Sequence, residues 1–497
     1  MRKIVYSLVF IFAAGFIFSA CEKEYLETYP TDNVSSFGVT SSTGTALAAL
    51  NGIHRTFYER RYGSQGRVGI GSWYYHFSEK AEDMVFNYAT WTTYVRWLDR
   101  SATSSYNRSS YLMMYDWIAN ANVLINGVDE DTAGSQDEKD IIVGQALLYR
   151  AFCHYNLVQV WGGRYDPAGG NSQPGVAIML ETTTEGQARA TVEEVYAQIN
   201  QDIDAAILLL DGKPRTNKSH LNVDIARGLK ARVALTMGNY SNAVSFAALA
   251  RTTDYDLMDS ATYFLGFRIG SQSNDEFMWA SHLAEDQTDK WGNYGAYVSR
   301  NFSSSSIRKN PRSISSILYN TISPTDVRKL LWDPTGDHLN LPPGITIVSS
   351  AARFPYTNQK FIAVSTGDSR VDVPHMRVSE MYLIEAEAEA RQGNDANAAA
   401  ALYTMAVARD AYYTLSTNTG QALIDEIMLQ RRAELWGEGF RWFDLKRLNL
   451  PLDRNGSNHK GSIINNLWDV PAGDNMWQSL IPQDEMDANE NMVQNPL

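Results

Sequence analysis

Apolar residues recur at helical spacing along much of this chain. Between Thr191 and Leu210 they fall on one stripe, at Val192, Val195, Tyr196, Ile199, Ile203, Ala206, Ile207 and Leu210. Thr191 is followed three residues later by Glu194, and this spacing predicts a capping box at the start of the helix. A second run of residues with helical character covers residues 138–161 and predicts another helix. The glycine pair Gly162-Gly163 marks its end.

Two further helix pairs are predicted to share one type of turn. The helical run over residues 226–237 meets Gly238, and the run over residues 378–391 meets Gly393. An alanine lies five residues after each glycine, inside the next predicted helix: Ala243 and Ala398. Glycine ends a helix readily and a small residue lets paired helices approach closely, as in tetratricopeptide-like hairpins. The pattern predicts a mainly α scaffold of such hairpins, although any antiparallel helix pair needs a similar turn and these two are not in tandem.

Helical periodicity is absent from long stretches between these helices. Residues 255–375 are rich in Ser, Asn, Gly, Pro and aromatic residues, and a second irregular region covers about residues 87–107. A third irregular region follows Pro451. Long irregular insertions in a folded domain usually serve a function. We therefore expect the ligand-binding residues of this chain to lie in these insertions.

The N-terminus has the layout of a secretory signal peptide. Arg2 and Lys3 precede an uncharged apolar run over residues 4–18, which small residues separate from Cys21. The run is too short for a stable membrane span. The sequence Phe-Ser-Ala-Cys resembles a bacterial lipobox, in which the cysteine is lipidated after cleavage, while the alternative is an ordinary signal peptide with a chance cysteine. We predict a signal peptide over residues 1–20, lipidation of Cys21 and an extended tether over residues 21–40.

Charge and cysteine content restrict the partners and the sources of stability. Cleavage would remove Arg2 and Lys3, so that the formal charge changes from −13 to −15. Such an acidic surface argues against nucleic acid and against anionic lipid head groups as partners. Cys153 is the only cysteine besides Cys21, so a lipidated chain has no intramolecular disulfide and its stability must come from packing.

Catalytic and metal-binding motifs are not found. The eight histidines are scattered singly, without a His-Glu-x-x-His motif, so we expect no metal and no cofactor. Glu79, Glu82 and Asp83 are the nearest candidates for the carboxylate pair of a glycoside hydrolase, which needs an acid and a base or nucleophile. A solvated helix face is the simpler interpretation of these three residues. We therefore do not expect an enzyme.

Clustered aromatic residues are better candidates for a binding site. The insertion at about residues 87–107 holds Asn87, Tyr88, Trp91 and Trp97, and the insertion at residues 255–375 holds Trp291, Asn293 and Tyr294. Sugar rings present apolar C–H faces that stack on aromatic rings, while their hydroxyls need polar partners. These seven residues are therefore the candidate glycan-binding residues. A place in the core is the alternative for any single aromatic residue among them.

The segment over residues 431–446 reads Arg-Arg-Ala-Glu-Leu-Trp-Gly-Glu-Gly-Phe-Arg-Trp-Phe-Asp-Leu-Lys. As an ordinary pair of amphipathic helices it would bury Leu435, Trp436, Phe440 and Phe443. Its charged residues would then form ion pairs three or four positions apart: Arg431, Arg432, Glu434 and Glu438.

The order of residues in this segment resembles the C-terminal motif of the RagB/SusD family of surface nutrient-binding lipoproteins. Residues 145–162, 377–388 and 481–496 are similar to other landmarks of that family, in the expected order. The resemblance implies one helical domain over residues 41–497, with ligand-binding insertions at about 87–107 and 255–375. In that family the C-terminal motif is structural and identifies the scaffold.

The same resemblance implies a function and a place in the cell. Family members sit over a TonB-dependent outer-membrane transporter of the SusC type and deliver a captured nutrient to it. Most bind glycans and some bind peptides. We therefore expect a lipid-anchored glycan-binding protein on the outer membrane, exposed at the cell surface. The alternatives are a peptide receptor of the same transport system, a purely structural lid, and a helical glycoside hydrolase.

Overall fold

The computed structural model describes residues 36–59, 62, 66–287 and 289–497. The predicted signal peptide, Cys21 and most of the predicted tether lie outside these residues. The tether was expected to extend to residue 40, but residues 36–40 form the helix α2 (Ser36–Thr40). None of the helices in the described part combines the length and the apolar character that a membrane crossing needs.

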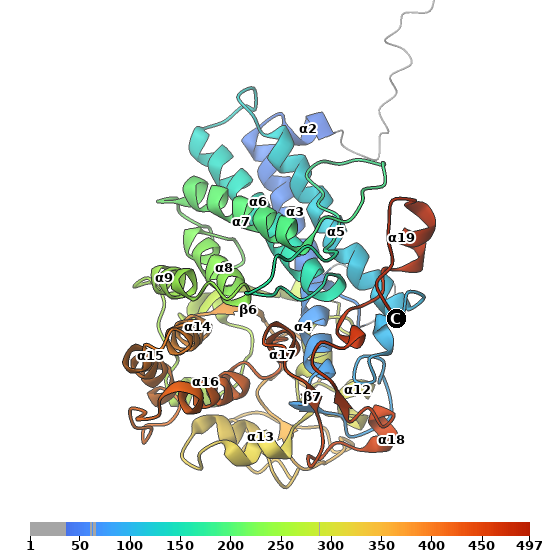
Figure 1. Cartoon of the computed structure of the whole chain (residues 1–497). Helices are drawn as coiled ribbons and strands as arrows, with labels where there is room; N and C mark the ends of the chain where they lie inside the picture. Colours follow the sequence, from blue (N-terminus) through green and yellow to red (C-terminus); the bar gives the residue numbers. More distant parts are fainter. Residues whose placement is uncertain (1–35, 60–61, 63–65, 288) are drawn as a thin grey trace, which may run out of the picture.

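Long helices packed in sequence order form the scaffold. Successive members contact one another from the N-terminal helices to the C-terminal motif, and Figure 1 shows them following one another along one side of the molecule. Their bounds are α3 (Thr43–Glu59), α5 (Ser105–Gly127), α6 (Gln136–Trp161), α7 (Val192–Leu210), α8 (Val223–Thr236), α9 (Tyr240–Ala250), α14 (Val378–Arg391), α15 (Asp395–Val407) and α16 (Gly420–Glu434). The predicted mainly α fold is confirmed.

Both helices predicted from their apolar stripes are present. The capping box of α7 is formed by Thr191 and Glu194, as expected. Helix α6 begins two residues before the predicted start, because Ser135 and Glu138 form a second capping box. These side chains satisfy backbone N–H groups that have no partner inside the helix.

The two predicted hairpins are also confirmed. Gly238 lies between α8 and α9 with φ +71°, and Gly393 lies between α14 and α15 with φ +80°. Glycine adopts these left-handed conformations without the steric cost that a side chain would add. Ala243 and Ala398 are both 0% exposed where the paired helices pack together.

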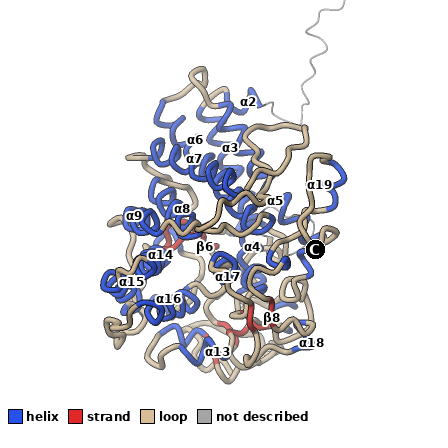
Figure 2. Tube along the Cα trace, viewed as in Figure 1, coloured by secondary structure: helices blue, strands red, loops and turns tan. Residues whose placement is uncertain are grey.

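The predicted insertions contain short helices and strands. An antiparallel sheet has the strand order β1-β3-β5-β4, and two-stranded sheets pair β2 with β6 and β7 with β8. Figure 2 shows β6 near the middle of the molecule beside α8 and α14, and β8 among loops in the lower part. Their bounds are β1 (Met84–Val85), β2 (Phe277–Ser281), β3 (Ser313–Ile314), β4 (Trp332–Asp333), β5 (Thr357–Asn358), β6 (Val373–Arg377), β7 (Leu452–Asp453) and β8 (Asp469–Val470).

Short helices complete the chain. They are α4 (Gly69–Lys80), α10 (Ser260–Phe264), α11 (Gly295–Val298), α12 (Ser305–Lys309), α13 (Ser316–Thr321), α17 (Arg441–Arg447), α18 (Gly461–Ile464) and α19 (Gln483–Ala488), with 3-10 turns at Leu98–Arg100, Ser271–Ser273, Glu285–Gln287, Val327–Leu331 and Asn475–Trp477. Because α5 starts at Ser105, the first insertion ends slightly before the predicted residue 107.

Large aromatic residues fill the core that joins the helices to the insertions. Trp73, Trp117, Trp161, Trp279 and Trp442 are each at most 1% exposed and belong to one cluster of buried residues. Cys153 lies in the same core as a free thiol. This packing holds the insertions on a rigid base.

Candidate functional site

The C-terminal motif forms a buried ion cluster. Its members come from six separate segments and are Glu276, Asp326, Arg328, Lys360, Arg377, Arg409, Glu434 and Glu438. Glu434 is 0% exposed and accepts hydrogen bonds from Arg377 at 2.7 Å, from Arg409 at 3.1 Å and from Arg328 at 3.3 Å. The arginines lower the pKa of Glu434 well below its usual value although burial opposes this.

The motif's charges therefore do not pair as the sequence suggested. An ordinary pair of amphipathic helices would form ion pairs three or four residues apart, but Arg431 binds Asp444 at 2.8 Å and Arg432 binds Asp83 at 2.5 Å. The reason is that α16 ends at Glu434 and the chain turns before α17, so the motif is not one continuous helical surface. Leu435 and Trp436 are buried as predicted, while Phe440 and Phe443 are half-buried.

The carboxylates of α4 and the residues after it are also held in ion pairs. Glu79 accepts from Arg312 at 2.8 Å, and Glu82 accepts from Arg441 at 2.7 Å. All three predicted candidates are buried, so the expected solvated helix face is wrong. Because Glu79, Glu82 and Asp83 are bound to arginines, they offer no free acid and base across a cleft.

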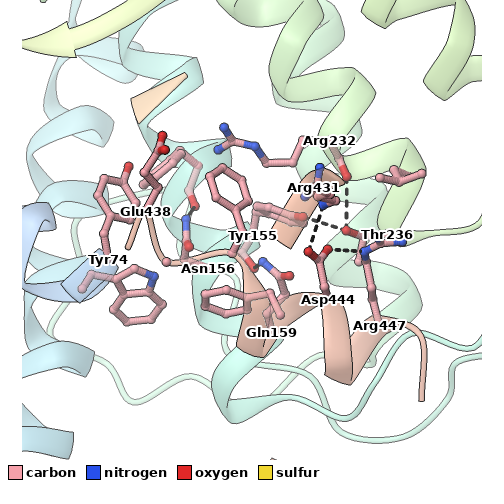
Figure 3. Close-up of a pocket in the computed structure, with 16 residues that line it drawn as sticks. Tyr74, Tyr155, Asn156, Gln159, Arg232, Thr236, Arg431, Glu438, Asp444 and Arg447 are labelled. Atoms are coloured by element: carbon pink, nitrogen blue, oxygen red, sulfur yellow. Dashed lines mark hydrogen bonds and ion pairs between the residues drawn. The ribbon is translucent and has the colours of Figure 1, made fainter. Parts of the chain in front are cut away.

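A small cavity lies behind the motif. Figure 3 shows its lining, in which Asp444 accepts hydrogen bonds from Arg431 and Arg447 at 2.8 and 2.9 Å. The cavity volume is about 50 Å³, which is room for a few water molecules. Ligand pockets are usually several times larger, so this cavity is part of the scaffold.

A larger groove of about 480 Å³ lies between α14, α16 and the end of α17. Arg391, Arg432 and Arg441 border it, and each is bound to a carboxylate elsewhere. The rest of its lining is mostly aliphatic and contains no aromatic ring. The groove therefore has no platform on which a sugar could stack.

The loop over residues 87–97, the first aromatic loop, exposes Tyr88 and Trp91 to the solvent, with exposed fractions of 51% and 47%. Asn310 fixes this loop, since its side-chain oxygen accepts from the backbone N–H of Asn87 at 2.9 Å and of Tyr88 at 3.0 Å. Trp91 has φ +55°, a left-handed conformation that is unusual for a bulky residue. Such conformations are often found where a structure holds a ligand-binding residue in place.

The second aromatic loop presents Trp291, which is 46% exposed. Its ring lies 5.4 Å from that of Phe302, and Lys290 Nζ lies 5.4 Å from the centre of the Trp291 ring. These contacts orient the indole without covering it. Trp291 thus combines a fixed position with an accessible ring.

The remaining candidate residues serve the fold. Asn87 donates to Pro311 O at 2.7 Å, and the Trp97 indole, 1% exposed, donates to Lys80 O at 2.8 Å. Asn293 donates to Ser369 at 2.7 Å, and the Tyr294 hydroxyl donates to Gly437 O at 3.0 Å. Because these four side chains are buried and already bonded, a ligand cannot stack on or bind to them in this structure, and we remove them from the candidate surface.

One segment supports both aromatic loops. Phe302 contacts Trp291, α11 packs on α12, and Asn310 directly follows α12 and donates to Thr90 O at 3.2 Å. The exposed residues Tyr88, Trp91 and Trp291, which we call the aromatic surface, therefore border the two ends of residues 302–310. Neither Phe302 nor Asn310 was predicted from the sequence, because neither carries a local signal for its contact across the fold.

No group of three or more His, Cys, Asp or Glu side chains is placed to hold a metal ion within the described residues. Burial lowers the pKa of His54 and His375 well below the usual histidine value. Burial together with Arg150 lowers the pKa of His154 to about 3. These imidazoles are neutral parts of the core at pH 7.

Comparison with protein families gives two matches. A family model described as the SusD family matches residues 339–497. A second model, described as starch-binding associating with outer membrane, matches residues 65–235. The comparison with curated proteins gave no match.

Solved structures share the fold over nearly the whole chain. A SusD-like carbohydrate binding protein from Bacteroides vulgatus is 25% identical with a TM-score of 0.78, over 91% of this chain and 98% of that chain. A SusD superfamily protein from Bacteroides thetaiotaomicron is 23% identical with a TM-score of 0.76, over 92% of this chain and 100% of that chain. Another from Bacteroides fragilis is 20% identical with a TM-score of 0.71, over 91% and 99%.

Proposed function

Since the chain belongs to the SusD/RagB family of non-catalytic binding proteins, we propose that it binds a nutrient glycan at the cell surface. In this proposal it delivers the glycan to a TonB-dependent outer-membrane transporter of the SusC type. The lipidated Cys21 holds it on the outer membrane. The family model that describes starch binding and association with the outer membrane supports both the ligand class and the location.

The observation that carries this proposal is the exposure of Trp91 and Trp291 at about half of their surface, in a protein whose other large aromatic residues are mostly buried. Both belong to irregular insertions and border the same supporting segment. An exposed and oriented indole offers the apolar face on which a sugar ring stacks. Lys290, the exposed residue before Trp291, offers a polar partner to the sugar's hydroxyls.

Glycan-array binding by the soluble protein lacking residues 1–21 tests the ligand class. A peptide-library pull-down with the same protein is the counterpart. The groove of about 480 Å³ beside α16 favours peptide binding as the second candidate function, because its lining is mainly aliphatic. Peptide capture without any glycan signal would replace the first proposal with the second.

Removal of either exposed indole should weaken glycan binding and leave stability almost unchanged. Trp91→Ala and Trp291→Ala each lose a stacking contact worth about 0.5–1.5 kcal/mol beyond the buried area, so we expect roughly a tenfold loss of affinity. Calorimetric titration measures the affinity, and thermal melting measures the stability.

Tyr412→Ala is the matched control for these two variants. Tyr412 is 79% exposed and follows α15, away from the aromatic surface, so its loss should change neither affinity nor melting temperature. Normal binding by Trp91→Ala and Trp291→Ala, accompanied by a sharp fall in melting temperature, would refute the assignment of the aromatic surface.

The proposed anchor predicts a change of location. Cys21→Ala should leave the fold intact, because Cys21 precedes the residues that the structure describes, but should release the protein from the outer membrane. Fractionation of cells that lack the transporter partner measures this release. Retention of the variant on the cell surface at the wild-type level would contradict lipidation of Cys21.

A further inference from the structure

Three arginines, Arg300, Arg308 and Arg353, lie beside α12 without a carboxylate partner. Together with the neutral His338 they form what we call the basic cluster. The backbone of Ala352 connects its arginines, since Ala352 N–H donates to Arg308 O at 2.7 Å and Ala352 O accepts from Arg300 Nη2 at 2.8 Å. Arg353 is the next residue and is exposed. Within the described residues, no ion pair joins any of these arginines to an Asp or Glu.

Among the buried arginines of the described residues, only Arg300 and Arg454 have no carboxylate partner. Arg150, Arg232 and Arg312 are buried or nearly so, and each is bound to a carboxylate at 2.7–2.8 Å. A buried cation normally requires such a partner, because removal from water is costly. Arg300 is 1% exposed and contacts only a histidine and a backbone carbonyl. The basic cluster therefore lacks a negative charge.

The polar atoms left over in the cluster are all donors. Arg300 Nη1, Arg308 Nε and His338 Nδ1 are buried and have no hydrogen-bond partner among the described residues. His338 Nε2 accepts from Arg300 at 2.8 and 3.1 Å, so the imidazole proton resides on Nδ1 and that atom is a donor. Burial and the nearby Arg300 lower the pKa of His338 to about 4, which keeps the imidazole neutral at pH 7.

The nearby acidic side chains do not neutralise these donors. Asp333 accepts from the backbone N–H groups of Thr335 and His338, and this holds His338 at φ +57°. Asp337 is exposed and contributes only its backbone oxygen, which accepts from Arg353 at 2.7 Å. The turn thus uses its carboxylate to position His338 and leaves the arginines unpaired.

The cluster adjoins the aromatic surface. Arg308 lies on α12, two residues before Asn310, which binds the loop of Tyr88 and Trp91. Arg300 lies two residues before Phe302, which contacts Trp291. A ligand lying across residues 302–310 would therefore cover the part of the chain that carries Arg308, whose side chain is half-buried.

We propose that the basic cluster is a subsite for an anionic group, a carboxylate or a sulfate, of a glycan bound on the aromatic surface. The inference rests on the proposed function and specifies its ligand class, an acidic oligosaccharide. Guanidinium groups suit this role because their planar donors match carboxylate and sulfate oxygens. The formal charge of −13 does not attract a polyanion from a distance, so recognition depends on these local contacts.

Calorimetric titration with three probes of equal length tests this inference. The probes are an oligogalacturonate, which carries carboxylates, a sulfated galactan oligosaccharide, which carries sulfates, and a neutral galactan oligosaccharide. We expect at least one anionic probe to bind about tenfold or more tightly than the neutral probe, and its affinity to fall as sodium chloride is raised. The probe that binds more tightly identifies the anionic group.

The variant Arg308→Gln/Arg353→Gln should lose about tenfold or more of its affinity for that anionic probe and keep its affinity for the neutral one. Arg353→Gln alone, at an exposed residue, gives the same comparison without a risk to folding. Arg55→Gln is the matched control, because Arg55 is an exposed arginine on α3 that pairs only with Glu59. Its binding should equal that of the wild type.

The outcomes separate the two proposals. Binding of the neutral probe with no preference for either anionic probe overturns the basic subsite and leaves glycan binding in place. Unchanged affinity of the double variant for an anionic probe also overturns the subsite. Failure of every glycan, both here and on the array, overturns the proposed function together with this inference.

Discussion

Glu434→Gln should lower the free energy of unfolding by about 3–5 kcal/mol, the usual cost of breaking a buried ion pair by removing one partner. Glu434 is 0% exposed and contacts Arg328, Arg377 and Arg409. Glutamine has nearly the same shape, so the substitution removes charge and leaves little empty space. The loss therefore measures electrostatics more than packing.

Charge balance explains the size of this effect. The buried ion cluster contains four cations, Arg328, Arg377, Arg409 and Lys360, and four carboxylates, Asp326, Glu276, Glu434 and Glu438. Removal of one carboxylate leaves an uncompensated positive charge out of contact with water. Lys360 can partly relieve it by losing a proton, because burial already lowers its pKa to about 8.

Chemical denaturation at pH 7 measures the loss, and Glu59→Gln is the control. Glu59 also belongs to a helix and pairs with an arginine, but the Arg55 side chain is 53% exposed. Exposed pairs contribute at most about 1 kcal/mol. An equal fall in the free energy of unfolding of the two variants would show that burial does not determine how much the ion cluster stabilises the protein.

Acid should reduce the difference between Glu434→Gln and the wild type. The arginines hold the pKa of Glu434 well below its value in the unfolded chain. Its contribution is therefore complete above the unfolded pKa of about 4.3 and is lost as the pH falls toward the folded pKa. The variant lacks this titration, so the two stabilities should begin to converge as the pH falls below about 4.

The helices could be predicted because their signals are local. The stripe over residues 192–210 and the capping residue Thr191 lie within one helix, and Gly393 lies next to the helices that it separates. Each of these signals depends on neighbours a few positions away. Contacts within one helix, and across the turn between two successive helices, can therefore be predicted from a single sequence.

The ion cluster could not be predicted in the same way. Arg377 and Glu434 are 57 residues apart, and Arg409 and Glu276 are 133 apart. Charge patterns at short range suggested pairs within the motif, but the turn after α16 directs these side chains to other segments. Only the packing of α14, α16 and the sheet of β2 and β6 brings them together.

The candidate site was predicted in part for a related reason. Irregular sequence identified the loops of Trp91 and Trp291, but it did not reveal which side chains of those loops turn inward. Trp97 lies only six residues after Trp91 with the same φ of +55°, yet it is 1% exposed. The Trp97 indole donates to the backbone carbonyl of Lys80, 17 residues earlier in the chain, and no pattern near Trp97 indicates this contact.

Trp442→Ala should destabilise the protein by about 3–5 kcal/mol, the usual cost of emptying a large buried aromatic site. Trp442 is 1% exposed and packs against Phe77, Trp97 and Trp477 with ring centres 5.0, 6.3 and 5.7 Å away. The loss leaves a cavity where α17 meets α4, which the surrounding rings cannot close. Thermal melting should show a much lower transition temperature than for the wild type.

Two comparisons make this prediction specific. Trp442→Phe should cost less than Trp442→Ala, because the indole Nε1 has no hydrogen-bond partner among the described residues and only ring volume is removed. Trp91→Ala removes an equally large side chain that is 47% exposed, so it should scarcely change the melting temperature. An unchanged melting temperature for Trp442→Ala would mean that the C-terminal motif lies on the surface, and its role would then have to be sought in ligand or partner binding.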